Sequence, residues 1–313
     1  MISIIVPVYN EQDNIAPLYA KLRPVLANFP EKSEIIFIND GSSDGTESAL
    51  ARVCELDTTV KVINFRRNHG QTAALVAGFD HAAGDIIIPI DGDLQNDPED
   101  IPRLISKVEE GFSVVSGWRK DRKDSPVRIL PSKLANWIIS HTFDVHLHDY
   151  GCTLKAYRKE AIQDIKLYGE MHRFIPIYAS WHGAKVTEIP VNHFPRTRGA
   201  SKYGLTRAIK VLLDLIVVKF LEDYNTKPIY VFGISAIFLF AISLLSGSLA
   251  IYLRLFEGIS FISTPLPLLV VMTFTIGILL ILMGLIAELI IRVYYEGQSK
   301  PIYFIRSTIN LSK

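Results

Sequence analysis

The chain has 313 residues, which is enough for one substantial domain and a smaller second part. Hydrophobic residues make up 49% of it and the mean hydropathy is +0.25, so we expect part of the chain to lie outside water. The formal net charge of +1 argues against a nucleic-acid-binding protein. The only cysteines, Cys54 and Cys152, predict neither a disulfide framework nor a zinc site, and they fit a reducing cytosol.

The first half of the chain alternates short apolar runs with helical patterns. The candidate strands are 3–7, 34–39, 61–65, 86–90 and 113–117, and the segment 100–110 has a helical pattern. Continuous apolar runs joined by helices predict a mostly parallel sheet that is covered on both faces. We therefore expect an α/β domain at the start of the chain.

Polar residues follow three of these candidate strands, in the segments 7–11, 39–45 and 91–95. In an open α/β sheet, ligands bind beyond the carboxyl ends of the strands, so the candidate site lies at this edge. The chain contains neither G-x-G-x-x-G nor G-x-x-x-x-G-K-[ST], so a dinucleotide cofactor and a P-loop are both unsupported.

Asp91-Gly92-Asp93 comes directly after the apolar run 86–90. Asp and Gly are ordinary turn residues, so a plain loop is the alternative. The position after a candidate central strand favours carboxylates that point into the site. Mg²⁺ or Mn²⁺ takes oxygen ligands and is commonly held by one or two carboxylates together with substrate phosphates. We predict a metal site that binds a diphosphate and stabilises the charge that develops as the diphosphate leaves.

Asp40, after the second strand, has two candidate roles. Its local pattern alone favours a turn residue that opens the next helix. However, Pro7, Tyr9 and Glu11 are expected beside it at the same edge, where they offer a ring edge and carboxylates to a base and a ribose. This neighbourhood favours nucleotide binding.

Two apolar runs, 229–253 and 267–291, each exceed the length of about 20 residues that crosses a bilayer. A buried helix pair is the alternative, but such helices usually carry a polar face. Basic residues flank the outer ends of both runs, so the positive-inside rule places both termini in the cytoplasm. Glu288 lies close to Arg292, which favours an interfacial ion pair over a functional site.

Before the first run, segment 205–221 has an amphipathic stripe that suits a helix in the headgroup plane better than one in a soluble core. The predicted parts are a cytosolic catalytic domain (1–203), a juxtamembrane amphipathic helix (204–228), a two-helix transmembrane domain (229–292) and a cytosolic tail (293–313).

Five motifs in order, PVYNE, INDGSSDGT, DGDLQ, HDYGC and RTRGASKY, resemble glycosyltransferase family 2. With its C-terminal pair of spans, the chain is similar to the polyisoprenyl-phosphate glycosyltransferases, near the dolichol-phosphate mannose synthases and nearer the bacterial bactoprenol glucosyltransferases. The resemblance covers nearly the whole chain, although the family usually has Asp-Asp where this chain has Asn39-Asp40. It implies a GT-A fold, which is Rossmann-like, and a bacterial inner-membrane protein.

The resemblance also implies roles for individual residues. Those on the nucleotide diphosphate are Pro7, Tyr9, Asn10, Glu11, Asp40, Asp91, Gly92 and Asp93, and those around the metal are Asp91, Asp93 and Gln95. Arg119, Arg128 and Ser132 are implied at the acceptor phosphate. Arg196 and Lys202 match a family motif in the segment 196–203, which we expect to close over the substrates and exclude water.

A lipid phosphate as acceptor changes what the site requires. Its second pKa is about 6, so it is anionic near pH 7 and can attack a sugar without a general base. Positive charge matters more, and the candidates are Arg119, Arg128, Arg196, Arg198 and Lys202. Runs of basic residues often form only a solvated surface or contacts to lipid headgroups. We adopt this interpretation for 120–123. Asp149, where relatives with hydroxyl acceptors keep a base, is assigned to positioning.

We expect an inverting transfer of a hexose from a nucleotide sugar to polyisoprenyl phosphate at the cytoplasmic membrane face, with UDP-glucose and undecaprenyl phosphate as the preferred pair. A GDP-mannose-dependent enzyme or another UDP-sugar is the nearest alternative. A lipid-linked-sugar transporter is disfavoured because two spans offer little translocation path. A polymerising synthase would carry Q-x-x-R-W, which is absent. The short anchors are compatible with a homo-oligomer.

Overall fold

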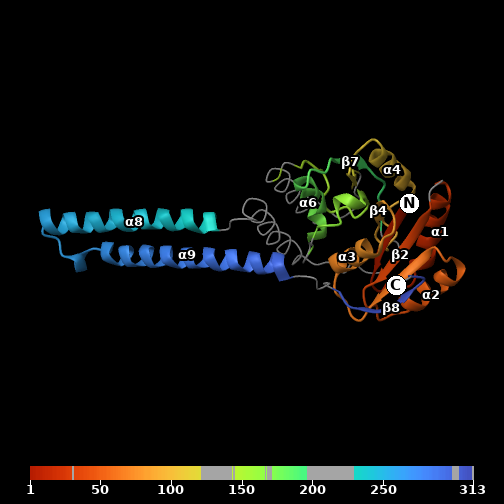
Figure 1. The fold of residues 1–313 in the computed structure, drawn as a ribbon, viewed down its shortest axis with the longest axis horizontal. Helices are drawn as coiled ribbons and strands as arrows, with labels where there is room; N and C mark the ends of the chain where they lie inside the picture. Colours follow the sequence, from red (N-terminus) through yellow and green to blue (C-terminus); the bar gives the residue numbers. More distant parts are fainter. Residues whose placement is uncertain are drawn as a thin grey trace. The chain divides into compact units, whose positions relative to one another are not determined.

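In a computed structural model, the described residues of the chain form two compact units. The described residues are 1–29, 32–120, 143, 145–165, 167, 171–195, 229–297 and 303–311. The first unit comprises 1–218 and 301–313, and the second comprises 219–300. The first unit is an α/β domain and the second contains a pair of long helices (Figure 1).

The α/β domain is built on an eight-stranded sheet in the order β7-β5-β6-β4-β1-β2-β3-β8. The strands are β1 (Ile2–Val8), β2 (Ser33–Asn39), β3 (Val60–Phe65), β4 (Ile86–Pro89), β5 (Val114–Trp118), β6 (Lys155–Arg158), β7 (Val186–Pro190) and β8 (Ile305–Ile309). The neighbours among β1 to β4 run parallel, as do β5 and β7, whereas β6 and β8 run antiparallel to their partners. All five predicted strands are confirmed, in a sheet that is mixed.

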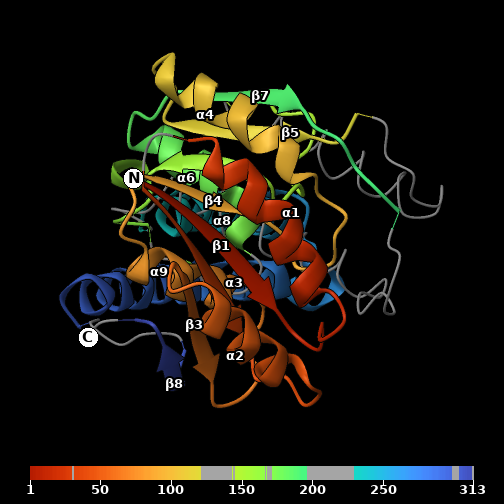
Figure 2. The same ribbon diagram turned by 90° about the vertical axis from the view of Figure 1, so that its right-hand side faces the viewer.

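Helices cover both faces of the sheet (Figure 2). The α-helices of this unit are α1 (Ile15–Ala27), α2 (Thr46–Leu56), α3 (Gln71–His81), α4 (Ile101–Glu109) and α6 (Ile175–Trp181), and the 3-10 helices are η1 (Pro98–Asp100), η2 (Lys159–Ala161) and η3 (Met171–Phe174). One apolar cluster joins α1, α2 and α4 to the sheet, and another joins α3 and α6 to it.

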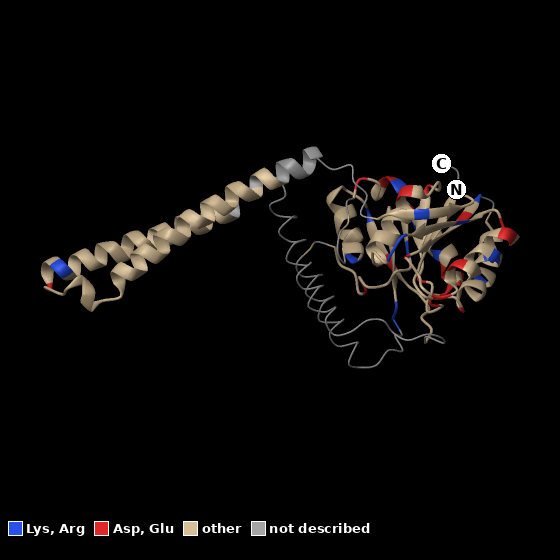
Figure 3. Ribbon diagram, turned by 90° about the horizontal axis from the view of Figure 1, so that it is seen from below, with Lys and Arg blue, Asp and Glu red and all other residues tan. Residues whose placement is uncertain are grey.

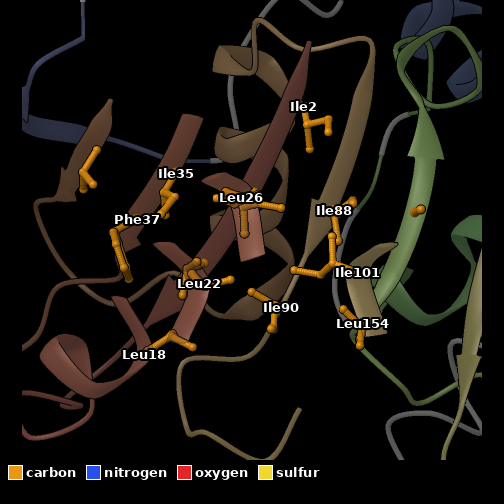
Figure 4. Packing of buried hydrophobic residues seen from close by; sticks show 14 of the residues in the cluster. Ile2, Leu18, Leu22, Leu26, Ile35, Phe37, Ile88, Ile90, Ile101 and Leu154 are labelled. Atoms are coloured by element: carbon orange, nitrogen blue, oxygen red, sulfur yellow. The ribbon is translucent and has the colours of Figure 1, made fainter. Parts of the chain in front are cut away.

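The cluster beneath α1 shows how the apolar periodicity is used. Leu18, Leu22 and Leu26 lie on one side of α1, at spacings of one helical turn, and all are buried. They pack beside inward-facing residues of the strands, such as Ile35 and Ile88 (Figure 4). This packing fixes β1, β2 and β4 side by side, and so brings the loops that follow them to one edge.

The C-terminal segment differs from the predicted division of the chain. The expected tail 293–313 includes the last residues of the second long helix and then β8, which pairs with β3. Without β8, β3 would present an unpaired edge, and covering such an edge satisfies its backbone hydrogen bonds. Tyr303 adds to the attachment, because its ring stacks on Phe65 and its hydroxyl donates to Asp80 at 2.9 Å.

The second unit is an antiparallel pair of helices, α8 (Ile229–Phe256) and α9 (Leu266–Gly297), joined through the 3-10 helix η4 (Phe261–Ser263). Within them, 232–256 and 266–287 are long and apolar enough to cross a membrane, with mean hydropathies of 2.3 and 2.8. Only 17% of each most apolar window is buried. Acidic and basic residues are nearly absent from the described part of the helix pair (Figure 3). The side chain of Glu288 and the predicted helix 204–228 lie outside the described residues.

Candidate active site

The loops after β1 and β2 are joined to each other by hydrogen bonds. We call them the β1 loop (residues 9–14) and the β2 loop (residues 40–45). The backbone N–H of Asn10 donates to Ser42 Oγ at 2.9 Å, and the N–H of Ser43 donates back to Asn10 Oδ1 at 2.8 Å. Asn10 has a φ of 53°, a left-handed conformation that Asn tolerates better than most residues. The two loops therefore form one connected rim at the carboxyl ends of β1 and β2.

Asp40 makes contacts within the protein that its predicted nucleotide role did not include. Its two carboxylate oxygens accept the backbone N–H groups of His69 and Gly70, at 2.6 and 2.9 Å. Burial raises the pKa of Asp40 despite these two hydrogen bonds. Gly41, with a φ of +67°, brings the backbone so close that a Cβ would lie 2.3 Å from the carbonyl carbon of Arg67. Asp40 thus holds the loop that follows β3.

The predicted metal loop, residues 90–97, is tightly packed and locally strained. Gly92 leaves no room for a side chain, since a Cβ would lie 2.7 Å from Val8 Cγ1. Leu94 adopts a φ of 63°, which is costly for a residue with a branched side chain. Such strain persists only where surrounding contacts hold it, and here Gln95 N donates to Asp93 Oδ1 at 3.2 Å. The loop is held in one conformation at the carboxyl end of β4.

The three predicted metal ligands present oxygen atoms of the type that Mg²⁺ and Mn²⁺ bind. Asp91 Oδ1 accepts a hydrogen bond from Gln71 Nε2 at 3.1 Å, and Gln95 donates its own Nε2 to the carbonyl of Phe194 at 3.2 Å. This bond orients the Gln95 amide so that its oxygen is the group left for a metal. Among the described residues no three His, Cys, Asp or Glu side chains form a metal cage. Two carboxylates and an amide suit a metal ion whose remaining ligands are oxygen atoms of a substrate phosphate.

Arg119 and Asp149 form a buried ion pair. Arg119 Nε and Nη2 donate to the two carboxylate oxygens of Asp149 at 2.7 and 2.9 Å. Burial works against the guanidinium charge, but the ion pair outweighs it and raises the pKa of Arg119. A guanidinium has more N–H donors than this ion pair uses. Arg119 can therefore bind a phosphate while Asp149 holds the guanidinium in its orientation. The positioning of the sugar or acceptor by Asp149 stays a prediction, and the contact observed for its carboxylate is with Arg119.

A recess beside β4 contains residues that no sequence motif singles out. Its lining includes Thr153, Lys155, His172 and Arg173. Lys155 is buried, its ammonium donates to the carbonyl of Tyr150 at 3.2 Å, and burial lowers its pKa. Gln71 Nε2 contacts Thr153 Oγ1 at 3.4 Å as well as Asp91, so the recess adjoins the predicted metal ligands.

The structure therefore gathers part of the predicted site. Pro7, Tyr9, Asn10, Glu11 and Asp40 lie on the rim formed by the ends of β1 and β2, and Asp91, Gly92, Asp93 and Gln95 follow β4. Arg128, Ser132, Arg196, Arg198 and Lys202 lie outside the described residues. The predicted site did not include Gln71, because this residue is the first of a helix. The preceding Gly70 is a sequence signal for the start of that helix.

Solved structures of other proteins share this fold. Mannosyl-3-phosphoglycerate synthase from Rubrobacter xylanophilus matches with a TM-score of 0.57 and 15% identity, over 71% of this chain and 74% of that one. Glucosyl-3-phosphoglycerate synthase from Mycobacterium tuberculosis, solved with Mn²⁺, UDP-glucose and phosphoglyceric acid, matches with a TM-score of 0.52 and 18% identity, over 70% and 79%. These similarities show the fold, and the domain has the predicted GT-A architecture.

Sequence relatives match over almost the whole chain. Dodecaprenyl-phosphate galacturonate synthase from Rhizobium johnstonii is 38% identical, with 97% of this chain and 92% of the relative covered. Undecaprenyl-phosphate 4-deoxy-4-formamido-L-arabinose transferase from Salmonella choleraesuis is also 38% identical, with 98% and 93% covered. Residues 3–166 match the family described as glycosyl transferase family 2. With the motifs, the fold and these relatives in agreement, the chain belongs to glycosyl transferase family 2.

Proposed function

We propose that the protein transfers a sugar from a nucleotide diphosphate sugar to a polyisoprenyl phosphate, with inversion at the anomeric carbon. The observation that carries this proposal is the combination of a strand-end rim and two carboxylates with a pair of candidate membrane helices in one chain. The relatives named for dodecaprenyl- and undecaprenyl-phosphate products support the acceptor class.

The donor lies along the carboxyl ends of β1, β2 and β4. Tyr9, Glu11 and Asp40 line the rim for the nucleoside, and Asp91, Asp93 and Gln95 supply oxygen ligands for Mg²⁺ or Mn²⁺. When bound, such an ion neutralises the charge that develops on the departing diphosphate. The strained loop around Leu94 holds these ligands before the donor arrives, which avoids reorganisation during the reaction.

The acceptor phosphate attacks the anomeric carbon directly, and the bond from that carbon to the diphosphate breaks. No proton has to be removed from a phosphate that is already anionic. Arg119, oriented by Asp149, binds the acceptor phosphate, and Arg128, Ser132, Arg196, Arg198 and Lys202 are proposed to complete its surroundings. The helices α8 and α9 anchor the enzyme in the bacterial inner membrane, with both termini in the cytoplasm, so that it meets a lipid substrate.

Glucose from UDP-glucose remains our proposed donor, with GDP-mannose or another UDP-sugar as the alternative. A hexuronate is the second candidate because the recess beside Asp91 is lined by Lys155, His172 and Arg173, and one relative is named for galacturonate. The guanidinium of Arg173 would favour a sugar carboxylate.

The test is turnover by the purified full chain with undecaprenyl phosphate and Mn²⁺ or Mg²⁺. UDP-glucose, UDP-galacturonate and GDP-mannose are supplied in parallel, and the lipid phase is analysed for a charged glycolipid. Asp93→Ala is expected to reduce the rate by at least about 100-fold, since it removes a ligand of the leaving diphosphate. Leu56→Ala, an exposed position on α2, serves as the control and should retain the wild-type rate. A complete lack of glycolipid, or equal rates for Asp93→Ala and wild type, contradicts the proposal.

A further inference from the structure

The strand β8 is linked to the nucleotide rim by a row of hydrogen-bonded polar side chains, of which Asn39 and Asn64 are buried. Asn64, on β3, donates its Nδ2 to Ser307 Oγ of β8 at 3.1 Å. Its Oδ1 accepts from Asn39 Nδ2 at 2.9 Å, and Asn39 Oδ1 accepts the backbone N–H of Ser42 at 3.1 Å. Ser42 Oγ then accepts the backbone N–H of Asn10. We call this series from Ser307 to Asn10 the amide ladder.

The direction of the amide ladder is set by a backbone group. Because the N–H of Ser42 can only donate, Asn39 must turn its oxygen toward it and its NH₂ toward Asn64. Asn64 must then present its own oxygen to Asn39 and its NH₂ to Ser307. Each amide is therefore used as both donor and acceptor.

Burial makes the two central members of the ladder sensitive to substitution. Asn39 and Asn64 are each only 1% exposed, so water cannot replace a lost partner. A buried polar group without its partner costs more free energy than the hydrogen bond itself contributed. The conformation of the β2 loop is therefore tied to the presence of Asn64 and, more weakly, of Ser307.

We propose that Asn64 is a positioning residue for the donor, and that β8 completes the donor site from the far end of the chain. The proposal rests on the proposed function insofar as the β1 and β2 loops bind the nucleotide. Asn64 does not contact the donor in this scheme. It acts through Asn39 and Ser42, and holds the two loops in the conformation that receives the base and ribose.

The test compares two substitutions at opposite ends of the pairing between β3 and β8. Asn64→Leu removes both polar atoms at the carboxyl end of β3, beside the rim. Asn310→Gly removes hydrogen bonds to the carbonyls of Cys54 and Val60 at the amino end, away from the rim, and glycine accepts the φ of 55° found there. Both changes weaken the attachment of β8, but only the first interrupts the amide ladder.

Two quantities are measured in the full chain: the Kd of UDP with Mn²⁺, and the hydrogen exchange of backbone amides in residues 40–45. Asn64→Leu is expected to raise the Kd about five-fold, which corresponds to the loss of one buried hydrogen bond. It should also speed hydrogen exchange in the β2 loop. The KM for UDP-sugar should rise likewise, while the KM for undecaprenyl phosphate stays unchanged. Asn310→Gly should lower the unfolding temperature and leave both quantities unchanged.

The outcomes separate the inference from the proposed function. Faster exchange in the β2 loop with an equal Kd for UDP would overturn the donor role, and unchanged exchange would overturn the ladder itself. If the wild type binds neither UDP nor GDP, the proposed function fails, and the exchange data still decide whether the ladder holds the loop. Should Asn64→Leu fail to fold, Ser307→Ala is the second variant, with a smaller effect in the same direction expected.

Discussion

In the catalytic unit the buried side chains are mostly large and aliphatic, whereas those between α8 and α9 are small. The described core of the catalytic unit includes Ile4, Ile36 and Leu18, all 0% exposed. Between the two helices the buried positions include Ala236, Ser243 and Ala250, spaced seven residues apart on α8, as well as Thr273 and Gly277 on α9. Large apolar side chains of α8 and α9 point outward instead.

A hydrocarbon environment for α8 and α9 would account for this difference. In water, the burial of aliphatic surface drives packing, so large side chains go inside. In hydrocarbon that drive is absent, and helices associate through close backbone approach at small residues and through hydrogen bonds. Ser243 Oγ donates to the carbonyl of Val270 across the helix pair at 3.1 Å, as this second rule predicts. The two units should therefore respond to opposite kinds of substitution.

The largest effect is expected where the catalytic unit buries charge. Asp149→Asn leaves the Arg119 guanidinium in a buried position without its counter-charge, which should cost about 3 kcal/mol in the free energy of unfolding. Turnover should fall as well, because Arg119 loses its orientation. Chemical unfolding and the glycolipid assay measure these two effects. The double variant with Arg119→Met should recover part of the stability and none of the turnover.

That prediction also tests the role assigned to Asp149. If Asp149→Asn abolished turnover but left UDP binding and the unfolding free energy intact, the carboxylate would act in the chemical step. A phosphate acceptor that needs no general base would then be the wrong description.

A smaller effect is expected from added bulk between the helices. A Cβ at Gly277 would lie 2.6 Å from the Phe240 ring, so Gly277→Leu should weaken the helix pair by about 1–3 kcal/mol. Thermal unfolding in detergent measures this, with the exposed neighbour Leu279→Ala as a control that should change little. UDP binding is expected to stay unchanged. A weaker affinity for UDP would show that the two units are not independent.

The smallest effect concerns the amino-terminal edge of the sheet. Burial disfavours the Glu34 carboxylate, but hydrogen bonds from Lys61, Ser3 and the backbone of Ala83 outweigh it and lower the pKa of Glu34. A carboxylate with a lowered pKa stabilises the folded state at pH values above its ordinary pKa. This stabilisation is lost as the pH falls through the pKa of the folded state.

Glu34→Gln should therefore lower the free energy of unfolding by about 1 kcal/mol near neutral pH, with a difference that shrinks below about pH 4. Unfolding temperatures recorded from about pH 3 to about pH 8, an interval that includes the ordinary Glu pKa of about 4.3, measure it. A difference that grows toward acid pH would contradict the sign. Glu109→Gln, on the exposed side of α4, is the control and should change the unfolding temperature little.

How well each strand could be predicted depended on how far apart in the sequence it and its partner strand lie. The strands β1 to β4 alternate with helices and have continuous apolar runs, so the strands themselves and the site edge could be predicted, although their order in the sheet was not. In contrast, β6 is a four-residue strand, Lys155–Arg158, and β8 pairs with a strand more than 200 residues earlier. No local pattern identifies such a partner.

The site divides in the same way. Asp91 and Asp93 could be selected because they end an apolar run. Gln71 and Asn64 could not, because one opens a helix and the other lies inside a strand, and each matters through a partner distant in sequence.

The position of β8 in the chain has a consequence for biosynthesis. A ribosome makes β3 long before β8, and both candidate membrane helices emerge in between. During that interval the edge of β3 is unpaired and Asn64 lacks Ser307, so the nascent domain presents an open strand edge to chaperones and to other chains. A soluble fragment that stops before residue 303 would keep this defect permanently. One that rejoins 303–311 through a linker in place of the helices is expected to remain monomeric.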